Sequence, residues 1–362
     1  MKKKIGIVFG GKSTEHEVSL HSASNIHDAI DKEQFDVVLL GVDRTGKWCF
    51  NQEYSLNNLD LSSIDYFEKS KTVHLESRHG KAFLTDKLSN TSIENFDVAF
   101  PIIHGSFGED GTLQGIFKSL DIPFVGADIL GSAICMDKDI TKRLLRDSNI
   151  PIADFITVYK ENKQTLVFEE VIEKLGVPFF VKPCNTGSSV GVSKATDKAS
   201  FYIAMDKAFE YDRKILIEEA IVGKELECAI LGNENPEASV IGEIIPTDEF
   251  YTYDTKYLDV DGVKMSIPAQ IPHELPNTLQ QIAIKVYKIM CCEGMARVDF
   301  FLRDDNTFVV NEINTLPGFA DTSMYSKLWI ASGVSYADLI TKLIGLAIEQ
   351  RTANNYLSTV IF

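Results

Sequence analysis

The fold is decided by the stretch Met295-Ala-Arg-Val-Asp-Phe-Phe-Leu302, which continues through Arg303-Asp-Asp-Asn306 into Thr307-Phe-Val-Val-Asn-Glu-Ile-Asn314. Two apolar runs on either side of a short polar segment predict a β-hairpin. If its turn has two or four residues, one face of the hairpin carries the polar side chains Arg297, Asp299, Glu312 and Asn314. The other face, which predicts a core apart from the awkward Asn311, carries Val298, Phe300, Leu302, Val309 and Ile313.

Two carboxylates on one face of a sheet require a cation between them. Asp299 and Glu312 would repel each other by about 4 kcal/mol at a separation near ~4 Å and an effective dielectric near ~20. Arg297 is one candidate for that cation. Converging oxygens from Asp, Glu and Asn are also the ligands that Mg²⁺ prefers, with phosphate oxygens completing its octahedron. The hairpin therefore predicts either a magnesium site or a surface patch of salt bridges.

Three lysines are candidates for binding the matching phosphate. Lys182 ends a predicted apolar strand, Lys138 begins a predicted helix that precedes it, and Lys256 lies in the tyrosine-rich stretch 250–264. Each lysine taken alone is more typical of a solvated surface residue. The phosphate interpretation therefore depends on the predicted magnesium site.

A loop of small residues, Gly187 to Gly191, separates two predicted strands and contains Ser188 and Ser189. Small residues allow backbone N–H groups to approach phosphate oxygens closely. The loop is not a Walker P-loop, because no Gly-Lys-Ser/Thr opens a helix there. A hairpin loop without a ligand is the alternative interpretation.

Acidic residues at the end of the predicted strand 215–218 are a candidate nucleoside site. Glu218 and Glu219 end this strand, and Glu225 begins the next one. A carboxylate there can hold ribose hydroxyls, and the backbone of Glu219, Ala220 and Ile221 can bind an adenine. Considered alone, these acids are more typical of ordinary exposed residues.

The N-terminus has the pattern of a doubly wound α/β unit. A strand from Lys4 to Phe9 is followed by Gly10-Gly11 and by a helical pattern from about Glu17 to Ile30. The dinucleotide motif G-x-G-x-x-G is absent. Glu15 and Glu17 at the helix start are typical of acids that favour the helix dipole, while a carboxylate at this turn would also suit a substrate ammonium group.

The composition predicts a globular protein with more than one domain. Of 362 residues, 44% are hydrophobic and 24% are charged, which is ample for several cores. The 36 basic and 52 acidic residues give a formal charge of −16, which disfavours nucleic acid and anionic membranes as partners. The order of predicted elements suggests domains at 1–126, 127–217 and 218–362.

Cysteine spacing and hydropathy indicate the compartment. Six cysteines are scattered without a CxxC pair, which disfavours a disulfide framework or a zinc site. The apolar run Ile5 to Phe9 is too short for a signal peptide, and no window approaches a membrane-spanning length. We therefore expect a cytoplasmic protein.

Together with further motifs, these segments resemble the D-alanine:D-alanine ligases of the ATP-grasp superfamily. The matching stretches follow the family's order from residue 4 to about 345, and they are Val8-Phe-Gly-Gly-Lys-Ser-Thr-Glu-His-Glu-Val-Ser19, His104-Gly-Ser-Phe-Gly-Glu-Asp-Gly-Thr-Leu-Gln-Gly115, Lys182 to Val192, Phe250 to Tyr257, Arg297-Val-Asp299 and Asn311-Glu-Ile-Asn-Thr-Leu-Pro-Gly318. Single motifs are moderately specific, whereas the run that begins at His104 and the ordered set are highly specific.

The resemblance implies an α/β ATP-grasp fold with a doubly wound N-terminal domain, and an ATP-dependent ligase that uses two Mg²⁺ ions or Mn²⁺ in their place. The carboxylate of one D-alanine attacks the γ-phosphate of ATP. The amine of a second D-alanine then attacks the resulting acylphosphate, giving D-alanyl-D-alanine for peptidoglycan precursors. A homodimer is also implied.

The resemblance further implies roles for the residues in the matching motifs. Glu15 would hold the ammonium group of the first D-alanine, linked by hydrogen bonds to Ser188 and Tyr257. Arg297 and the backbone N–H of Gly318 would stabilise the oxyanion. The second D-alanine would meet His104, Ser323 and Met324. ATP would be bound by Lys138, Lys182, Ser188, Ser189, Glu218, Glu219, Ala220, Ile221, Glu225 and Lys256, and magnesium by Asp299, Glu312 and Asn314.

A lid over residues 249–265 would exclude water from the acylphosphate. Tyr257 in this lid favours an amine as the second nucleophile, because the related D-alanyl-D-lactate ligases offer histidine there. The alternatives are a ligase that couples D-alanine to D-serine or D-lactate, a nicotinamide-dependent oxidoreductase, and a nucleotide-binding regulator without turnover.

Overall fold

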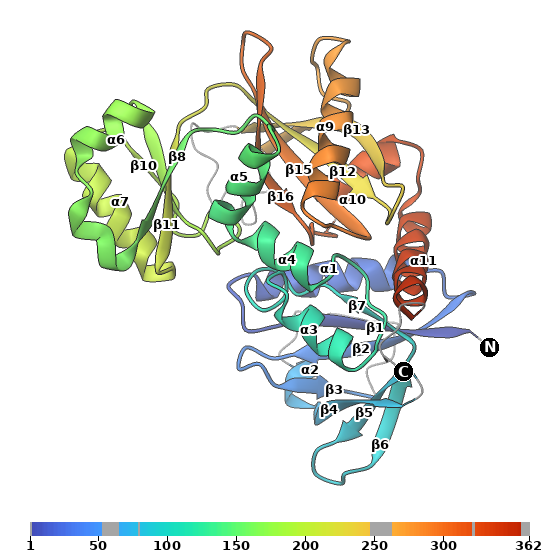
Figure 1. The fold of residues 1–362 in the computed structure, drawn as a ribbon. Helices are drawn as coiled ribbons and strands as arrows, with labels where there is room; N and C mark the ends of the chain where they lie inside the picture. Colours follow the sequence, from blue (N-terminus) through green and yellow to red (C-terminus); the bar gives the residue numbers. More distant parts are fainter. Residues whose placement is uncertain (1, 53–64, 79, 247–262, 321–322, 356–362) are drawn as a thin grey trace, which may run out of the picture.

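The computed structural model describes residues 2–52, 65–78, 80–246, 263–320 and 323–355. Three sheets organise these residues, with seven, four and five strands. In Figure 1 the four-stranded sheet and its helices project to one side, while the seven-stranded and five-stranded sheets lie one above the other. The mixed α/β class predicted from the sequence is confirmed.

The seven-stranded sheet begins with the predicted strand–turn–helix unit. Strand β1 (Lys3–Gly10) pairs in parallel with β2 (Phe35–Val42) and β7 (Val98–Pro101), and helix α1 (His16–Ala29) connects β1 to β2. The sheet order β6-β5-β4-β3-β2-β1-β7 continues through antiparallel strands. The remaining elements are β3 (Trp48–Phe50), α2 (Asp65–Glu68), β4 (Lys71–Arg78), β5 (Lys81–Asp86), β6 (Ser92–Phe96), α3 (Thr112–Ser119) and α4 (Ile129–Met136).

The sequence predicts that residues 51–95 are polar and irregular, with a small hairpin around Val73 to Phe83, but the described residues from 65 onward are more regular than this. The predicted hairpin is present as β4 and β5. A third strand, β6, extends it. The alternate residues Val73, Ala82, Leu84 and Phe96 are buried in one core cluster, so the sheet is held by a few apolar side chains within a polar sequence.

The four-stranded sheet is antiparallel where its pairings are described, in the order β10-β9-β11-β8. Helices α6 and α7 pack on it through a core that includes Val171, Phe201 and Met205. Its elements are α5 (Lys138–Asp147), β8 (Phe155–Tyr159), the 3₁₀ helix η1 (Lys160–Thr165), α6 (Phe168–Leu175), β9 (Phe179–Pro183), β10 (Ser193–Ala195), α7 (Lys198–Tyr211) and β11 (Lys214–Glu219). The predicted boundary between residues 217 and 218 falls within β11. The division into three domains remains a prediction.

The five-stranded sheet has helices on both faces. Its order is β14-β13-β12-β15-β16, and all its pairs are antiparallel. Cys228 and Ile230 face the core beneath α9, while Ala229 and Leu231 face α10 and α11. The elements are β12 (Lys224–Leu231), β13 (Glu237–Pro246), β14 (Val263–Ser266), α9 (Leu275–Ile289), β15 (Met295–Leu302), β16 (Phe308–Asn314), α10 (Met324–Ala331) and α11 (Tyr336–Asn355).

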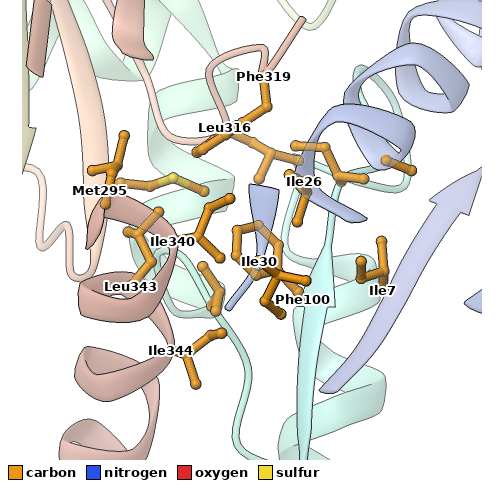
Figure 2. Close-up of a cluster of buried hydrophobic side chains, with 14 of the residues drawn as sticks. Ile7, Ile26, Ile30, Phe100, Met295, Leu316, Phe319, Ile340, Leu343 and Ile344 are labelled. Carbon is orange, nitrogen blue, oxygen red and sulfur yellow. The ribbon is translucent and has the colours of Figure 1, made fainter. Parts of the chain in front are cut away.

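One hydrophobic core joins the seven-stranded sheet to the five-stranded sheet. Figure 2 shows Ile7, Ile26 and Phe100 from the first unit close to Met295 and Leu316 from the other. Helix α11 fills the space between them with Ile340, Leu343 and Ile344, all fully buried. The two units therefore form one packed body.

The hairpin register is confirmed for the polar face and wrong in one detail for the core face. Arg297 faces Asn314, and Asp299 faces Glu312, directly across β15 and β16. Beyond Asp299 the register shifts, so that Phe300 faces Val310. The connection 303–307 is longer than predicted and a bulge at Asn311 absorbs the extra residue. Val310, and not Val309, therefore packs in the core beneath α9.

No single helix in the described part of the chain is long and apolar enough to cross a membrane. Helices α10 and α11 pass on length and composition only as a pair, with an angle of 105° between them. Both supply buried side chains to the shared core, among them Leu328, Trp329 and Leu343.

Candidate active site

The turn after β1 delivers Glu15 to the interior. Gly10 has a φ of +91°, and a Cβ atom there would lie 2.3 Å from the carbonyl oxygen of Val42, so only glycine fits. Glu15 stands at the N-terminus of α1 with 6% of its surface exposed, yet its side chain makes no capping hydrogen bond. The Glu15 side chain therefore does not cap α1 by a hydrogen bond, and its carboxylate is directed elsewhere.

The Glu15 carboxylate meets the small-residue loop of the four-stranded unit. The Ser188 hydroxyl donates a hydrogen bond to Oε1 of Glu15. Ser188 and Ser189 both have left-handed backbone conformations, with φ of +51° and +58°. On the opposite side, a Cβ atom on Gly105 would lie 2.6 Å from Oε2 of Glu15. The carboxylate thus lies where three chain segments converge.

A cavity of about 500 Å³ opens at this point. It is lined by the first turn, by the segment around Gly105 and by the loop at Thr186 and Gly187. Lys12 and Arg44 add positive charge to its wall beside Glu15. A small zwitterion is complementary to such a lining, because its ammonium and carboxylate groups both find opposite charges.

His104 is 4% exposed, and its Nδ1 atom lies 3.5 Å from Oε1 of Glu109. Its Nε2 atom lies 3.2 Å from the hydroxyl of Ser22, which accepts a hydrogen bond from the backbone N–H of Phe319 at 3.2 Å. Burial raises the pKa of Glu109, the charge of Glu15 raises it further, and the hydrogen bond to His104 opposes both. Glu109, to which sequence reasoning gave no role, belongs to the matching run that begins at His104.

Three carboxylates form a row across the five-stranded sheet. Asp299 on β15 faces Glu227 on β12 and Glu312 on β16. Arg297 donates to both oxygens of Asp299, at 2.7 and 2.6 Å, and its Nε atom lies 3.0 Å from Oε2 of Glu227. Burial alone would lower the pKa of Arg297, but these two carboxylates raise it well above its usual value.

Sequence reasoning missed Glu227. Its signal is the alternation of Glu225 and Glu227 in the run Lys224-Glu-Leu-Glu-Cys-Ala-Ile230, which places both acids on one face of a strand. That β12 lies beside β15 is a matter of sheet order, which a strand pattern alone does not reveal.

The oxygen atoms of the predicted metal ligands suit Mg²⁺ that is also bound by the phosphates of a nucleotide. Asp299, Glu312 and Asn314 offer oxygen atoms from neighbouring positions on one face of the β15–β16 hairpin. Among the described residues, no three acidic, histidine or cysteine side chains are grouped closely enough to hold a metal ion by themselves. Mg²⁺ is usually bound by one or two carboxylates together with phosphate oxygens and waters, so such a group is not required.

Two of the predicted phosphate-binding lysines lie close to this row. The Lys138 ammonium lies 3.8 Å from Oε2 of Glu312 and donates to the carbonyl oxygen of Thr186 at 2.7 Å. Lys182 forms an ion pair with Glu218, whose other oxygen pairs with Lys142. Lys142 is 1% exposed and was not singled out from the sequence, because a lysine within a helix is ordinarily solvated.

The predicted nucleoside residues lie at the end of β11 and the start of β12. Glu218 is buried, whereas Glu219 accepts a hydrogen bond from the backbone N–H of Asp154 at 2.9 Å and lies 3.5 Å from Arg303. The backbone N–H groups of Glu219 and Ala220 donate to carbonyl oxygens of Asp154 and Pro178. Ile221 and Glu225 are half-buried.

The segment after β16 reaches back to the first unit. A Cβ atom on Gly318 would lie 2.8 Å from the hydroxyl of Ser323, which is the N-cap of α10. The side chain of Met324 is buried in the shared core, so only its backbone remains for a substrate. Lys256 and Tyr257 lie outside the described residues, as does most of the predicted lid 249–265.

Comparison with known proteins covers nearly the whole chain. Residues 4–127 match a family described as the D-ala D-ala ligase N-terminus, and residues 144–345 match the D-ala D-ala ligase C-terminus. A relative from Escherichia coli K12, D-alanine–D-alanine ligase A, is 52% identical over 99% of this chain and 100% of its own length.

Two solved structures are similar to this one. VanG D-Ala:D-Ser ligase from Enterococcus faecalis has a TM-score of 0.85 and 35% identity, covering 96% of this chain and 100% of that chain. D-alanine–D-alanine ligase from Bacillus anthracis, complexed with ATP, has a TM-score of 0.73 and 28% identity, covering 97% and 99%.

Proposed function

This chain belongs to the D-alanine–D-alanine ligase family, and from that membership we propose how its residues carry out the ATP-dependent joining of two D-alanine molecules. The product, D-alanyl-D-alanine, is a dipeptide for peptidoglycan precursors. A carboxylate is a poor electrophile, so the first D-alanine has to be activated before an amine can attack it. Transfer of the γ-phosphoryl group of ATP to that carboxylate supplies the leaving group.

Glu15 binds the ammonium group of the first D-alanine. The support is its buried carboxylate, which faces the cavity beside Gly105 and Gly187 and accepts a hydrogen bond from Ser188. Because Glu15 and Ser188 come from different units, binding of the substrate also holds these units together. Tyr257 completes this link when the lid 249–265 closes.

Arg297 and the backbone N–H of Gly318 stabilise the oxyanion that forms when the amine attacks. Arg297 is suited to this role, because its two carboxylate partners fix its orientation and keep it charged. A donor of this kind commonly contributes about 3 to 4 kcal/mol to the transition state. His104, Ser323 and the backbone of Met324 lie at the site of the second D-alanine.

ATP lies between the four-stranded and five-stranded sheets, with its phosphates on Lys138, Lys182 and Lys256. Ser188 and Ser189 cover the phosphates, and Glu218 to Ile221 and Glu225 hold the nucleoside. Mg²⁺, two ions of it or Mn²⁺ in its place, would be held by Asp299, Glu312 and Asn314 and would neutralise the charge of the phosphates. The protein acts as a homodimer in the cytoplasm.

The convergence of Glu15 and the Thr186 loop beside Lys138 carries this proposal. Its test is phosphate release from ATP, measured with D-alanine alone and with D-alanine plus D-serine or D-lactate. We expect release with D-alanine alone and a preference for it as the second substrate. A preference for D-lactate would overturn the proposed specificity, and tight NADH binding without ATP binding would overturn the ligase.

A ligase for D-serine is the second candidate, and the likeness to VanG favours it. The higher identity to the D-alanine ligase, 52% against 35%, favours D-alanine as the second substrate. Competition between the two amino acids at equal concentration separates these candidates, because the dipeptide products differ in mass by one oxygen atom.

A further inference from the structure

A buried ion-pair cluster lies between helix α5 and strand β11. One carboxylate, Glu218, is shared by two lysines, with Lys142 on one oxygen and Lys182 on the other. Glu218 is 4% exposed and Lys142 is 1% exposed, whereas the side chain of Lys182 retains 12% exposure. Figure 1 shows α5 between the four-stranded and five-stranded sheets.

The two lysines differ in where else they can reach. Lys142 projects from α5 into the protein, where the centroid of the Phe155 ring lies 5.9 Å from its Nζ atom and the charges of Lys182 and Glu312 also act on it. Lys182 ends β9, directly before the loop that carries Ser188 and Ser189. The side chain of Lys182 is 12% exposed and that of Lys142 is 1% exposed, so Lys182 is the lysine that is placed to exchange Glu218 for a phosphate.

Such an exchange has an electrostatic cost. If Lys182 moved to a phosphate while Glu218 had no other cation, a fully buried carboxylate would be left uncompensated, which is strongly unfavourable. Lys142 removes this cost, because it pairs with the second oxygen of Glu218 whether or not Lys182 stays. One lysine is enough to neutralise Glu218 before the nucleotide binds. The second lysine, Lys142, is needed once Lys182 has moved to a phosphate.

We propose that Lys142 is a positioning residue for the nucleotide: it is the permanent counter-ion of Glu218 and thereby releases Lys182 to the phosphates of ATP. This inference rests on the proposed function, in which Lys182 binds phosphate. Glu218 holds Lys182 beside the loop until the nucleotide arrives, and Lys142 keeps Glu218 neutralised afterwards.

The test is ADP binding in the presence of Mg²⁺, measured by calorimetry on the full chain. We expect Lys142→Met to weaken ADP binding by about tenfold, because Lys182 then becomes the sole partner of Glu218. Lys142→Arg should restore the affinity to within about threefold. In steady-state kinetics the KM for ATP should rise, while the KM for D-alanine stays unchanged.

A matched control is available on the same helix. Arg146 lies over the same Phe155 ring, at 5.7 Å from its centroid, but it is exposed and has no described contact with Glu218. Arg146→Met should leave ADP affinity unchanged. If Lys142→Met also leaves it unchanged, Lys142 merely supports the fold and the inference is overturned.

Glu218→Gln completes a double-mutant cycle and covers the case in which Lys142→Met does not fold. With the carboxylate removed, Lys142→Met should cost less than about twofold in ADP affinity relative to Glu218→Gln alone. If Lys142→Met still weakened ADP binding tenfold in the Glu218→Gln background, Lys142 would not act through Glu218 and the inference would be contradicted. Failure of the proposed function is separate, because the unmodified chain would then bind no ADP at all.

Discussion

At the scale of single residues, the row of carboxylates Glu227, Asp299 and Glu312 lies close to positively charged side chains to which we assign roles in the reaction. Arg297 occupies both oxygens of Asp299, and Lys138 lies 3.8 Å from Glu312. The guanidinium of Arg297 and the ammonium of Lys138 thus offset part of the negative charge of the row. Glu312 is the more exposed carboxylate of the hairpin pair, with 36% of its side chain accessible, so it is the better placed to receive an ion.

Glu312→Gln removes a charge from this row at constant size. We expect turnover to fall to the background rate, because the amide binds Mg²⁺ far more weakly than a carboxylate does. The melting temperature should stay within a degree or two, since Glu312 lies on an open face of the sheet. Phosphate release checks the first expectation, with exposed Glu234→Gln as the control. Retained activity would remove Glu312 from the metal set.

Glu109 should make stability depend on pH. Its pKa is raised in the folded protein, chiefly by burial, so the folded state holds the proton more tightly than the unfolded chain does. Stability is therefore lost as pH rises from about the unfolded pKa through the folded pKa. Glu109→Gln cannot ionise, so its stability should fall less between pH 5 and pH 8 than that of the unmodified protein.

Urea denaturation at both pH values measures this difference, and Glu173→Gln on the exposed face of α6 is the control. An unchanged pH dependence in Glu109→Gln would show that another group carries the effect.

At the scale of elements, helix α5 is fixed by its first residues. Asp137 caps the helix by accepting from the backbone N–H groups of Asp139 and Ile140, and it also pairs with Lys214 on β11 at 2.5 Å. Asp137→Ala should destabilise the protein by about 1 to 2 kcal/mol, through loss of the cap and of the ion pair.

Asp137→Asn keeps the cap and removes only the charge, so it should lose less stability than Asp137→Ala. Chemical denaturation measures both variants. Equal losses would mean that the ion pair with Lys214, and not the cap, fixes the start of α5.

The sequence predicts elements well where apolar and polar residues alternate clearly. The hairpin of β15 and β16 follows from such alternation, including the facing pair Asp299 and Glu312. The bulge at Asn311 does not follow, because it depends on the length of the connection 303–307. Helix α10 was not expected, since much of its surface is apolar and it is buried between a sheet and α11, which removes the amphipathic signal.

The site is predictable to the extent that its residues lie in local motifs. Glu15, Ser188 and Lys138 were singled out from such motifs, and the fold brings them together. Lys142 and Glu227 were missed, because their importance comes from neighbours on other strands. Strand order and helix placement determine those neighbours, and neither can be read from a local pattern.

At the scale of the whole molecule, the shared core between the seven-stranded and five-stranded sheets should dominate stability. Ile344 on α11 is fully buried within it. Ile344→Ala should cost about 2 to 5 kcal/mol and lower the melting temperature of both units together. Ile330→Ala, which truncates a half-exposed side chain on α10, should have little effect.

Calorimetry checks this prediction, because a single shifted transition is expected for the two units. If Ile344→Ala split the transition into two, the units would be independently stable and the core between them would be a weak interface.

Because α11 packs between the seven-stranded and five-stranded sheets, these two units share one hydrophobic core. The four-stranded sheet has a hydrophobic core of its own, and its described links to the first unit include the hydrogen bond from the Ser188 hydroxyl to Glu15. We expect a ligand that holds Ser188 away from Glu15 to inhibit the proposed reaction, because it removes a contact between the four-stranded unit and the site of the first substrate.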